Sequence, residues 1–124
     1  MGFMDKSRTF DLASSMGVPV PSTIKFSTRE ELLNIDLPFP FIIKPAFSSG
    51  SRGLYRIESK ETQEKIADLA FQSPVKYVAQ DLIPTEKNAI CVTVLYSQTH
   101  KLKAAFANER LSEYPRGGGP SVLR

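Results

Sequence analysis

Residues 39–54 read FPFIIKPAFSSGSRGL, an apolar run that ends in Lys44 and is followed by a loop of serine and glycine. A buried strand seldom ends in an unpaired lysine, because burying an ammonium group without a partner is costly. The loop offers backbone N–H groups, serine hydroxyls and an arginine, which together suit a polyanion such as the phosphates of a nucleotide. A Gly/Ser hairpin turn with solvated charges explains the same residues, so this stretch leaves both interpretations open.

The composition predicts one small globular domain: 124 residues, 41% of them hydrophobic and 23% charged. No apolar run approaches the roughly 20 residues that a membrane-spanning helix needs, and no signal-peptide pattern opens the chain. A single cysteine, Cys91, excludes an internal disulfide. We therefore expect a cytoplasmic protein without membrane contact.

The net charge of +3 comes from basic and acidic residues that alternate through most of the chain. There is no basic helix and no stripe of basic and aromatic residues, so we expect no nucleic-acid partner. One histidine and one cysteine are too few for a typical zinc site.

Capping residues and apolar spacing predict two helices in the first part of the chain. Asp5 is placed to cap a helix over residues 6–16 that stops at Gly17. Ser27 and Glu30 are spaced as a capping box for a short second helix.

A third helix is predicted over residues 60–72, opened by Ser59. Ile66, Leu69 and Ala70 recur at helical spacing and form its expected apolar stripe.

Strands are predicted where β-branched and aromatic residues dominate, at residues 41–44, 54–57, 75–80, 89–96 and 101–111. Residues 112–121 contain two prolines and three glycines and are predicted to be a loop. We expect an α+β fold, in which the first three strands form a small antiparallel sheet with the helices packed against it. The last two strands form a hairpin that begins a second sheet.

Taken in order, these segments resemble the front half of an ATP-grasp domain, as in carbamoyl-phosphate synthetase large subunits, biotin carboxylase and many carboxylate–amine ligases. Each motif is weak alone, and the resemblance depends on their order and spacing. The motifs are DK at 5–6 with GVPVP at 17–21, PFIIKP at 40–45 with SGSRG at 49–53, YVAQDLI at 77–83, and RLSEYP at 110–115 with GGG at 117–119.

The resemblance implies an N-terminal and lid subdomain over residues 1–84, and the truncated start of the central ATP-grasp subdomain over residues 85–124. It also implies an ATP-dependent ligase that phosphorylates a small carboxylate, after which a nucleophile displaces phosphate from the acyl-phosphate. ATP and Mg²⁺ are the implied cofactors. The metal ligands are expected beyond the last residue, so we expect no metal ligand here and no ATP turnover by this chain alone.

The site residues are implied by the same resemblance. Lys6 and Lys44 would reach the ATP phosphates, and the lid loop would fold over the β and γ phosphates through Ser48, Ser49, Gly50, Ser51, Arg52 and Gly53. The adenine hinge would comprise Gln80, Asp81, Leu82 and Ile83, with Glu86 near the ribose and Arg110 as the catalytic residue at the triphosphate or acyl-phosphate.

The sequence departs from the family pattern at the hinge and after it. Gln80 stands where a hinge acid is common, and Ala89 and Thr93 stand where acids often follow. Two other functions therefore compete with a ligase fragment: a non-catalytic nucleotide-binding or regulatory module, and a small basic nucleic-acid-binding domain. An isolated two-stranded ribbon is marginal in water, so we also expect the hairpin over residues 89–111 to support a homodimer.

Overall fold

The computed structural model describes residues 5–48, 52–72, 74–84, 89–114 and 121–123. The chain forms two compact units, Met1–Ile83 and Pro84–Arg124. Helices and antiparallel sheets alternate irregularly, which confirms the expected α+β class. Among the described residues, no helix has the length and apolar character needed to cross a membrane.

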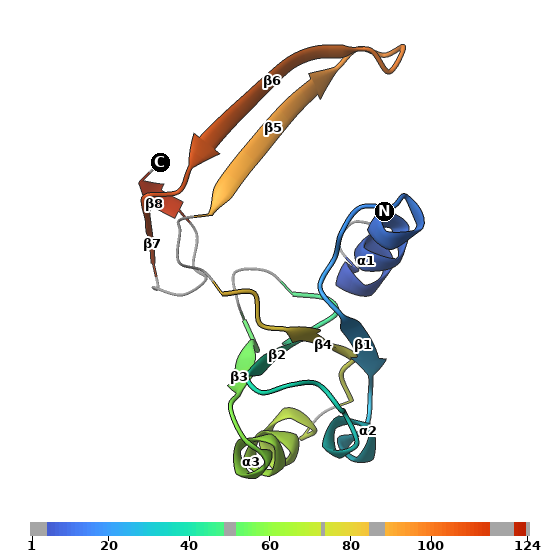
Figure 1. Ribbon diagram of the computed structural model, residues 1–124, viewed down its shortest axis with the longest axis vertical. Helices are drawn as coiled ribbons and strands as arrows, with labels where there is room; N and C mark the ends of the chain where they lie inside the picture. Colours follow the sequence, from blue (N-terminus) through green and yellow to red (C-terminus); the bar gives the residue numbers. More distant parts are fainter. Residues whose placement is uncertain (1–4, 49–51, 73, 85–88, 115–120, 124) are drawn as a thin grey trace. The chain divides into compact units, whose positions relative to one another are not determined.

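The first unit is built on a four-stranded antiparallel sheet with the strand order β1-β4-β2-β3 (Figure 1). Its elements follow the chain as α1 (Lys6–Ser15), β1 (Thr23–Phe26), α2 (Arg29–Leu33), β2 (Phe41–Pro45), β3 (Tyr55–Ile57), α3 (Lys60–Ala70) and β4 (Tyr77–Asp81). Strand β1 was absent from the sequence prediction, and β4 begins at Tyr77 rather than at Val75. The predicted antiparallel pairing of β2 with β3 is confirmed.

The core lies on the sheet face that α2 and α3 cover (Figure 1). Alternate strand residues reach it, because successive side chains of a strand point to opposite faces. The aromatic rings of Phe26 and Tyr77 stack there with centroids 5.6 Å apart. Its buried members are Phe26, Leu32, Phe41, Ile43, Ile57, Ala67, Ala70, Tyr77 and Ala79.

Helix α3 packs through a face that matches the predicted stripe in part: Ala70 is buried and Ile66 packs against the core, as expected. Leu69 is 55% exposed, whereas Gln63 and Ala67 are buried with Ala70. The buried Gln63 side chain donates to the Leu32 carbonyl at 2.6 Å. The end of α2 leaves carbonyl groups without helical partners, so a polar donor and small residues suit this contact better than leucine does.

The capping box of α2 lies one residue later than predicted. Thr28, not Ser27, is the N-cap, and its hydroxyl accepts from the Glu31 backbone N–H at 3.2 Å. The Glu31 carboxylate accepts in return from the backbone N–H of Thr28 at 3.1 Å and of Ser27 at 2.7 Å. Two overlapping S/T-x-x-E patterns occur in this segment, and the tertiary fold selects the second.

The second unit contains a long two-stranded ribbon of β5 (Ile90–Tyr96) and β6 (Leu102–Glu109). The predicted turn between them is confirmed, with His100 at φ 58°. The prediction of a continuous loop over residues 112–121 is wrong at both ends, because β7 (Ser112–Glu113) pairs with β8 (Ser121–Leu123). That pairing joins residues on either side of the glycine-rich segment, which a local pattern does not reveal.

Candidate functional site

The face of the four-stranded sheet turned away from the core is contacted by α1. Strand alternation places Ile42 and Lys44 of β2 on this face, opposite Gln80 and Val78 of β4. We call these four residues the α1-side face. Val78 and Gln80 are both buried, so the α1-side face is covered at its centre and not a solvated surface.

The Lys44 side chain extends from the α1-side face near the end of β2 and lies against α1. Its Nζ is 5.2 Å from the centroid of the Phe10 ring, which places the ammonium group over an aromatic face. Burial lowers the pKa of Lys44, and the positive charge of Lys6 lowers that pKa further. The fold therefore brings Lys6 and Lys44 close enough to interact electrostatically.

Lys6 is the first residue of α1, directly after the N-cap Asp5. Its Nζ donates to the Ser48 carbonyl at 2.6 Å, the Ser48 hydroxyl at 3.1 Å and the Pro45 carbonyl at 3.2 Å. Burial lowers the pKa of Lys6, and the nearby Asp5 carboxylate opposes that shift. Lys6 thus fastens the start of α1 to the start of the Ser/Gly loop through neutral oxygen atoms.

These two lysines leave positive charge uncompensated at the end of β2. Within the described part of the chain, neither Lys6 nor Lys44 forms an ion pair with a carboxylate. Lys6 contacts carbonyls and a hydroxyl and lies near the Asp5 carboxylate, and Lys44 lies against an aromatic ring. Two partly buried ammonium groups without an ion-pair partner form a site suited to a multiply charged anion.

The structure describes part of the predicted lid loop. Ser48 receives the Lys6 ammonium, and Arg52 is exposed. Gly53 has φ +70°, and a Cβ added there would lie 2.9 Å from Cγ of Pro45. Glycine is therefore required where the loop returns against β2. The predicted Ser49, Gly50 and Ser51 lie outside the described residues.

The predicted hinge residues lie at the end of β4 and directly after it. The buried Gln80 amide donates to the Thr23 hydroxyl at 2.8 Å, and the Asp81 backbone N–H donates to the Ser22 carbonyl at 3.3 Å. The Oδ1 atom of Asp81 is buried without a hydrogen-bond partner among the described residues. Leu82 is half-buried and Ile83 is 59% exposed.

Two predicted residues lie outside the described part of the first unit. Glu86 lies outside the described residues. Arg110 belongs to the second unit, where its backbone N–H donates to the Ala89 carbonyl at 2.8 Å.

Phe10 is the site residue that sequence reasoning missed. It follows Lys6 by one helical turn, so the two side chains share a face of α1. The helical spacing of Lys6 and Phe10 was the signal available in the sequence. Only the tertiary contact shows that the Phe10 ring lies against the Lys44 ammonium group.

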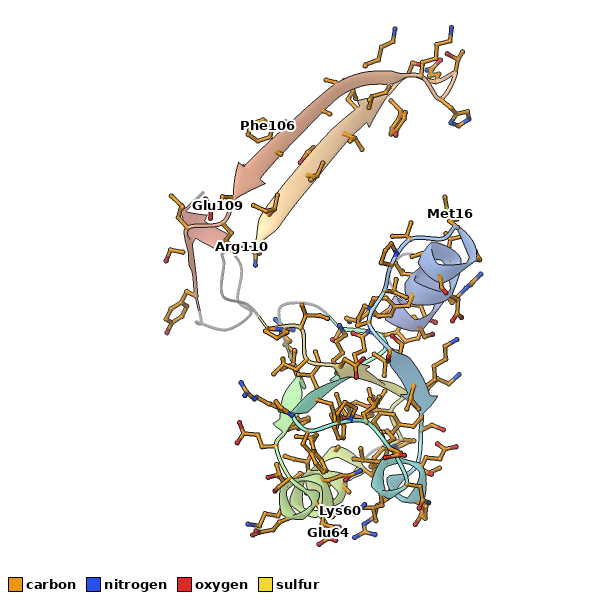
Figure 2. The ribbon with its side chains drawn as sticks, in the orientation of Figure 1. Met16, Lys60, Glu64, Phe106, Glu109 and Arg110 are labelled. Atoms are coloured by element: carbon orange, nitrogen blue, oxygen red, sulfur yellow. The ribbon has the colours of Figure 1, made fainter. Side chains whose placement is uncertain are left out.

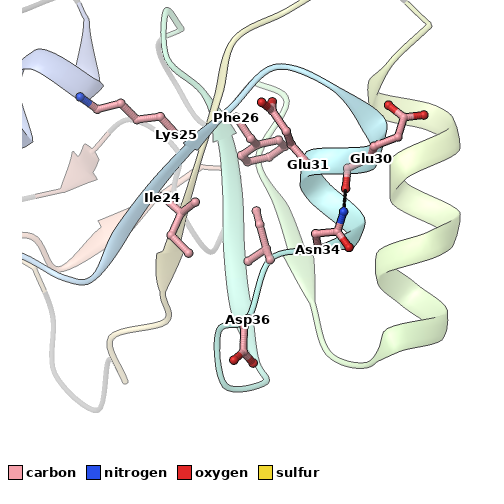
Figure 3. Close-up of a pocket in the computed structure, with 8 residues that line it drawn as sticks. Ile24, Lys25, Phe26, Glu30, Glu31, Asn34 and Asp36 are labelled. Carbon is pink, nitrogen blue, oxygen red and sulfur yellow. Dashed lines mark hydrogen bonds between the residues drawn. The ribbon is translucent and has the colours of Figure 1, made fainter.

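A separate open cavity of about 510 Å³ lies between the edge strand β1 and α2 (Figure 3). At its rim the Asn34 side chain donates to the Glu30 carbonyl, and Glu31 is engaged in the capping box. None of the predicted site residues lines it, so the lysine pair remains the stronger candidate site. The lining residues are Ile24, Lys25, Phe26, Glu30, Glu31, Asn34, Ile35 and Asp36.

The curated proteins that resemble this chain in sequence are D-alanine–D-alanine ligases. No family model matches the sequence. The chain is 37% identical over 82 residues to D-alanine–D-alanine ligase B of Pseudomonas putida, a match that covers 64% of this chain and 24% of that enzyme. The chain therefore spans about a quarter of the length of the curated relatives it matches.

Solved structures share the fold at low sequence identity. The ADP complex of N5-carboxyaminoimidazole ribonucleotide synthetase matches 90% of this chain and 29% of its own, with a TM-score of 0.76 and 18% identity. A RimK domain protein ATP-grasp from Sphaerobacter thermophilus matches 87% of this chain and 42% of its own, with a TM-score of 0.62 and 14% identity.

Proposed function

Because this chain has the fold of a segment of the ATP-grasp ligases, we propose that it contributes phosphate-binding lysines to an ATP-dependent carboxylate–amine ligase. The match to a D-alanine–D-alanine ligase favours a small amino acid as the carboxylate substrate over the carbamoyl-phosphate synthetase branch. In this proposal the first unit is the lid subdomain and the second unit is the start of the central subdomain.

The uncompensated lysine pair is the observation that carries the proposal. Lys6 and Lys44 come from α1 and β2, and both ammonium groups have a pKa lowered by burial. An ATP triphosphate would supply the missing negative charge and would exchange with the neutral oxygens that Lys6 now contacts. The opposite charges of an ammonium group and a phosphate add Coulomb attraction that a neutral carbonyl or hydroxyl does not supply, which favours that exchange.

In the reaction, these residues would bind and orient the triphosphate. Phosphoryl transfer depends mainly on positioning and on neutralising the charge of the phosphoryl group. Lys44 and Lys6 would hold the transferring end, and Ser48 and Gly53 would place the loop backbone near it. Arg110 remains proposed as the catalytic residue from the second unit, acting on the acyl-phosphate.

Adenine would be held by the backbone after β4. The Asp81 carbonyl would accept from the adenine amino group, and the Ile83 N–H would donate to the ring. The Gln80–Thr23 hydrogen bond joins β4 to β1 beside this segment and would hold it in place. The side chains of Leu82 and Glu86 are proposed to contact the base and the ribose.

Mg²⁺ would neutralise the β and γ phosphates of the nucleotide. The described residues contain no group of three or more His, Cys, Asp and Glu side chains placed to hold a metal ion. We propose that its ligands come from the remaining three-quarters of such a ligase.

Titration of the chain with a non-hydrolysable ATP analogue, with and without Mg²⁺, tests this function. Amide signals of Lys44, of residues 46–48 and of Asp81–Ile83 are expected to shift in NMR spectra and to saturate together. A protein that stays folded while both groups of signals remain unmoved would reject nucleotide binding by this chain. Adenosine should shift only the Asp81–Ile83 signals and inorganic triphosphate only the signals around Lys44 and Ser48, which separates the base contact from the phosphate contact.

The β5–β6 ribbon is proposed as the surface for a protein partner. Both of its faces carry exposed apolar residues: Val92 and Val94 project on one face and Phe106, 65% exposed and labelled in Figure 2, on the other. Exposed large apolar side chains gathered on one element are typical of an interaction site. For the isolated chain we propose pairing with a second copy of the chain.

Sedimentation velocity is expected to show a concentration-dependent monomer–dimer equilibrium for the isolated chain. Phe106→Lys should shift it toward monomer by at least about tenfold in Kd, because a charge would be buried at the contact. Lys103→Gln on the same strand serves as the matched control. A chain that stays monomeric at millimolar concentration would contradict the homodimer.

A further inference from the structure

Phe10 lies where it determines the position of the Lys44 ammonium group. It comes from the middle of α1, and Lys44 comes from the end of β2. The ring centroid lies 5.2 Å from Nζ, inside the roughly 6 Å range of a cation–π contact. No other aromatic ring contacts this ammonium group among the described residues.

The ring attracts the lysine without neutralising it. A carboxylate in the same place would cancel the charge of Lys44 and would compete with an incoming anion. A ring acts through its quadrupole and has no net charge. Lys44 is therefore held against α1 without a neutralising carboxylate beside it.

The contact also holds Lys44 against repulsion from Lys6. The positive charge of Lys6 disfavours the charged form of Lys44. Both lysines meet α1, since Phe10 stands one helical turn after Lys6 on the same helix face. A single helix thus sets the spacing of both ammonium groups: it carries Lys6 itself and presents the ring that receives Lys44.

We propose that Phe10 is a positioning residue for Lys44, which holds its ammonium group on the α1 side of the sheet, where Lys6 also lies, for contact with a polyphosphate. The proposal rests on the proposed nucleotide-binding function. In this proposal Phe10 affects binding of the phosphate end of the nucleotide and does not affect binding of the base. Another flat ring should replace it, whereas an aliphatic side chain should not.

Three variants test this role: Phe10→Leu, which keeps an apolar side chain but removes the ring; Phe10→Tyr, which keeps the ring; and Leu12→Ala, an exposed control on α1. Affinities for inorganic triphosphate, a non-hydrolysable ATP analogue and adenosine are measured by calorimetry or NMR. We expect Phe10→Leu to weaken triphosphate and ATP-analogue binding about five- to tenfold. Phe10→Tyr and Leu12→Ala should stay within about twofold of the wild type.

Adenosine separates positioning from a general structural role. Its affinity should be unchanged in Phe10→Leu, and the ring-current shift of the Lys44 side-chain methylene next to Nζ should disappear in that variant and persist in Phe10→Tyr. Equal weakening of adenosine and triphosphate, or full triphosphate affinity in a folded Phe10→Leu protein, would overturn the role of Phe10. A wild-type chain that binds none of the three ligands would instead reject the proposed function.

Discussion

Replacing Lys44 with alanine is expected to weaken binding of a non-hydrolysable ATP analogue by about 10- to 100-fold. Hydrogen bonds that involve charged groups contribute about 1.5–3 kcal/mol, and Lys44 has no carboxylate partner within the described residues that already uses its charge. The loss should fall on phosphate recognition, so affinity for inorganic triphosphate should decline in parallel. Isothermal titration calorimetry at fixed ionic strength measures both.

Lys25→Ala is the matched control for this variant. Lys25 lies on the same sheet, but it is exposed and already paired with Asp11 of α1. Its removal lowers the net charge by the same amount and should change affinity less than about twofold, since exposed ion pairs contribute little. Equal losses in Lys25→Ala and Lys44→Ala would show that net charge, not the lysine pair, governs binding.

Replacing Phe41 with alanine is expected to lower the free energy of unfolding by about 3–5 kcal/mol, the usual cost of truncating a buried phenylalanine. Phe41 is fully buried at the start of β2, where it pairs with Ile57 of β3 and Asp81 of β4. A cavity at that point would loosen three strands together. Urea unfolding followed by far-UV circular dichroism measures the change.

Phe39→Ala is the matched control for Phe41→Ala. Its ring stacks on Phe41 with centroids 5.6 Å apart, but Phe39 is 46% exposed. The control should therefore cost no more than about 1 kcal/mol. A loss as large in Phe39→Ala as in Phe41→Ala would contradict the assignment of the core to the sheet face under α2 and α3.

Local sequence signals predicted the elements whose formation depends on nearby residues. The Asp5 cap, the stop at Gly17 and the Ser59 cap are confirmed, because a capping side chain acts on the backbone two or three residues away. The strand over residues 41–44 is confirmed for a similar reason. Aromatic and β-branched residues fit the pleated, half-buried surface of a sheet, so a short run of them indicates a strand.

The incorrect predictions for α3 and for residues 112–121 share a different cause. In α3, burial of Gln63 in place of Leu69 depends on which helix face meets the end of α2. The pairing of β7 with β8 depends on two segments that are separated by the glycine-rich stretch. Contacts between distant residues decided each outcome, and local patterns carry no information about them.

The amino-acid sequence by itself determined the chemical types at the candidate site: a lysine that opens a helix, a lysine that ends an apolar strand, and a loop of serine and glycine that follows it. Only the tertiary structure decided that Lys6 lies near enough to Lys44 to influence its charge, that neither forms an ion pair with a carboxylate within the described residues, and that the Phe10 ring lies against Lys44. The physical reason is that α1 packs on the sheet face opposite the core. That packing places α1 beside the end of β2, although the two segments are far apart along the chain.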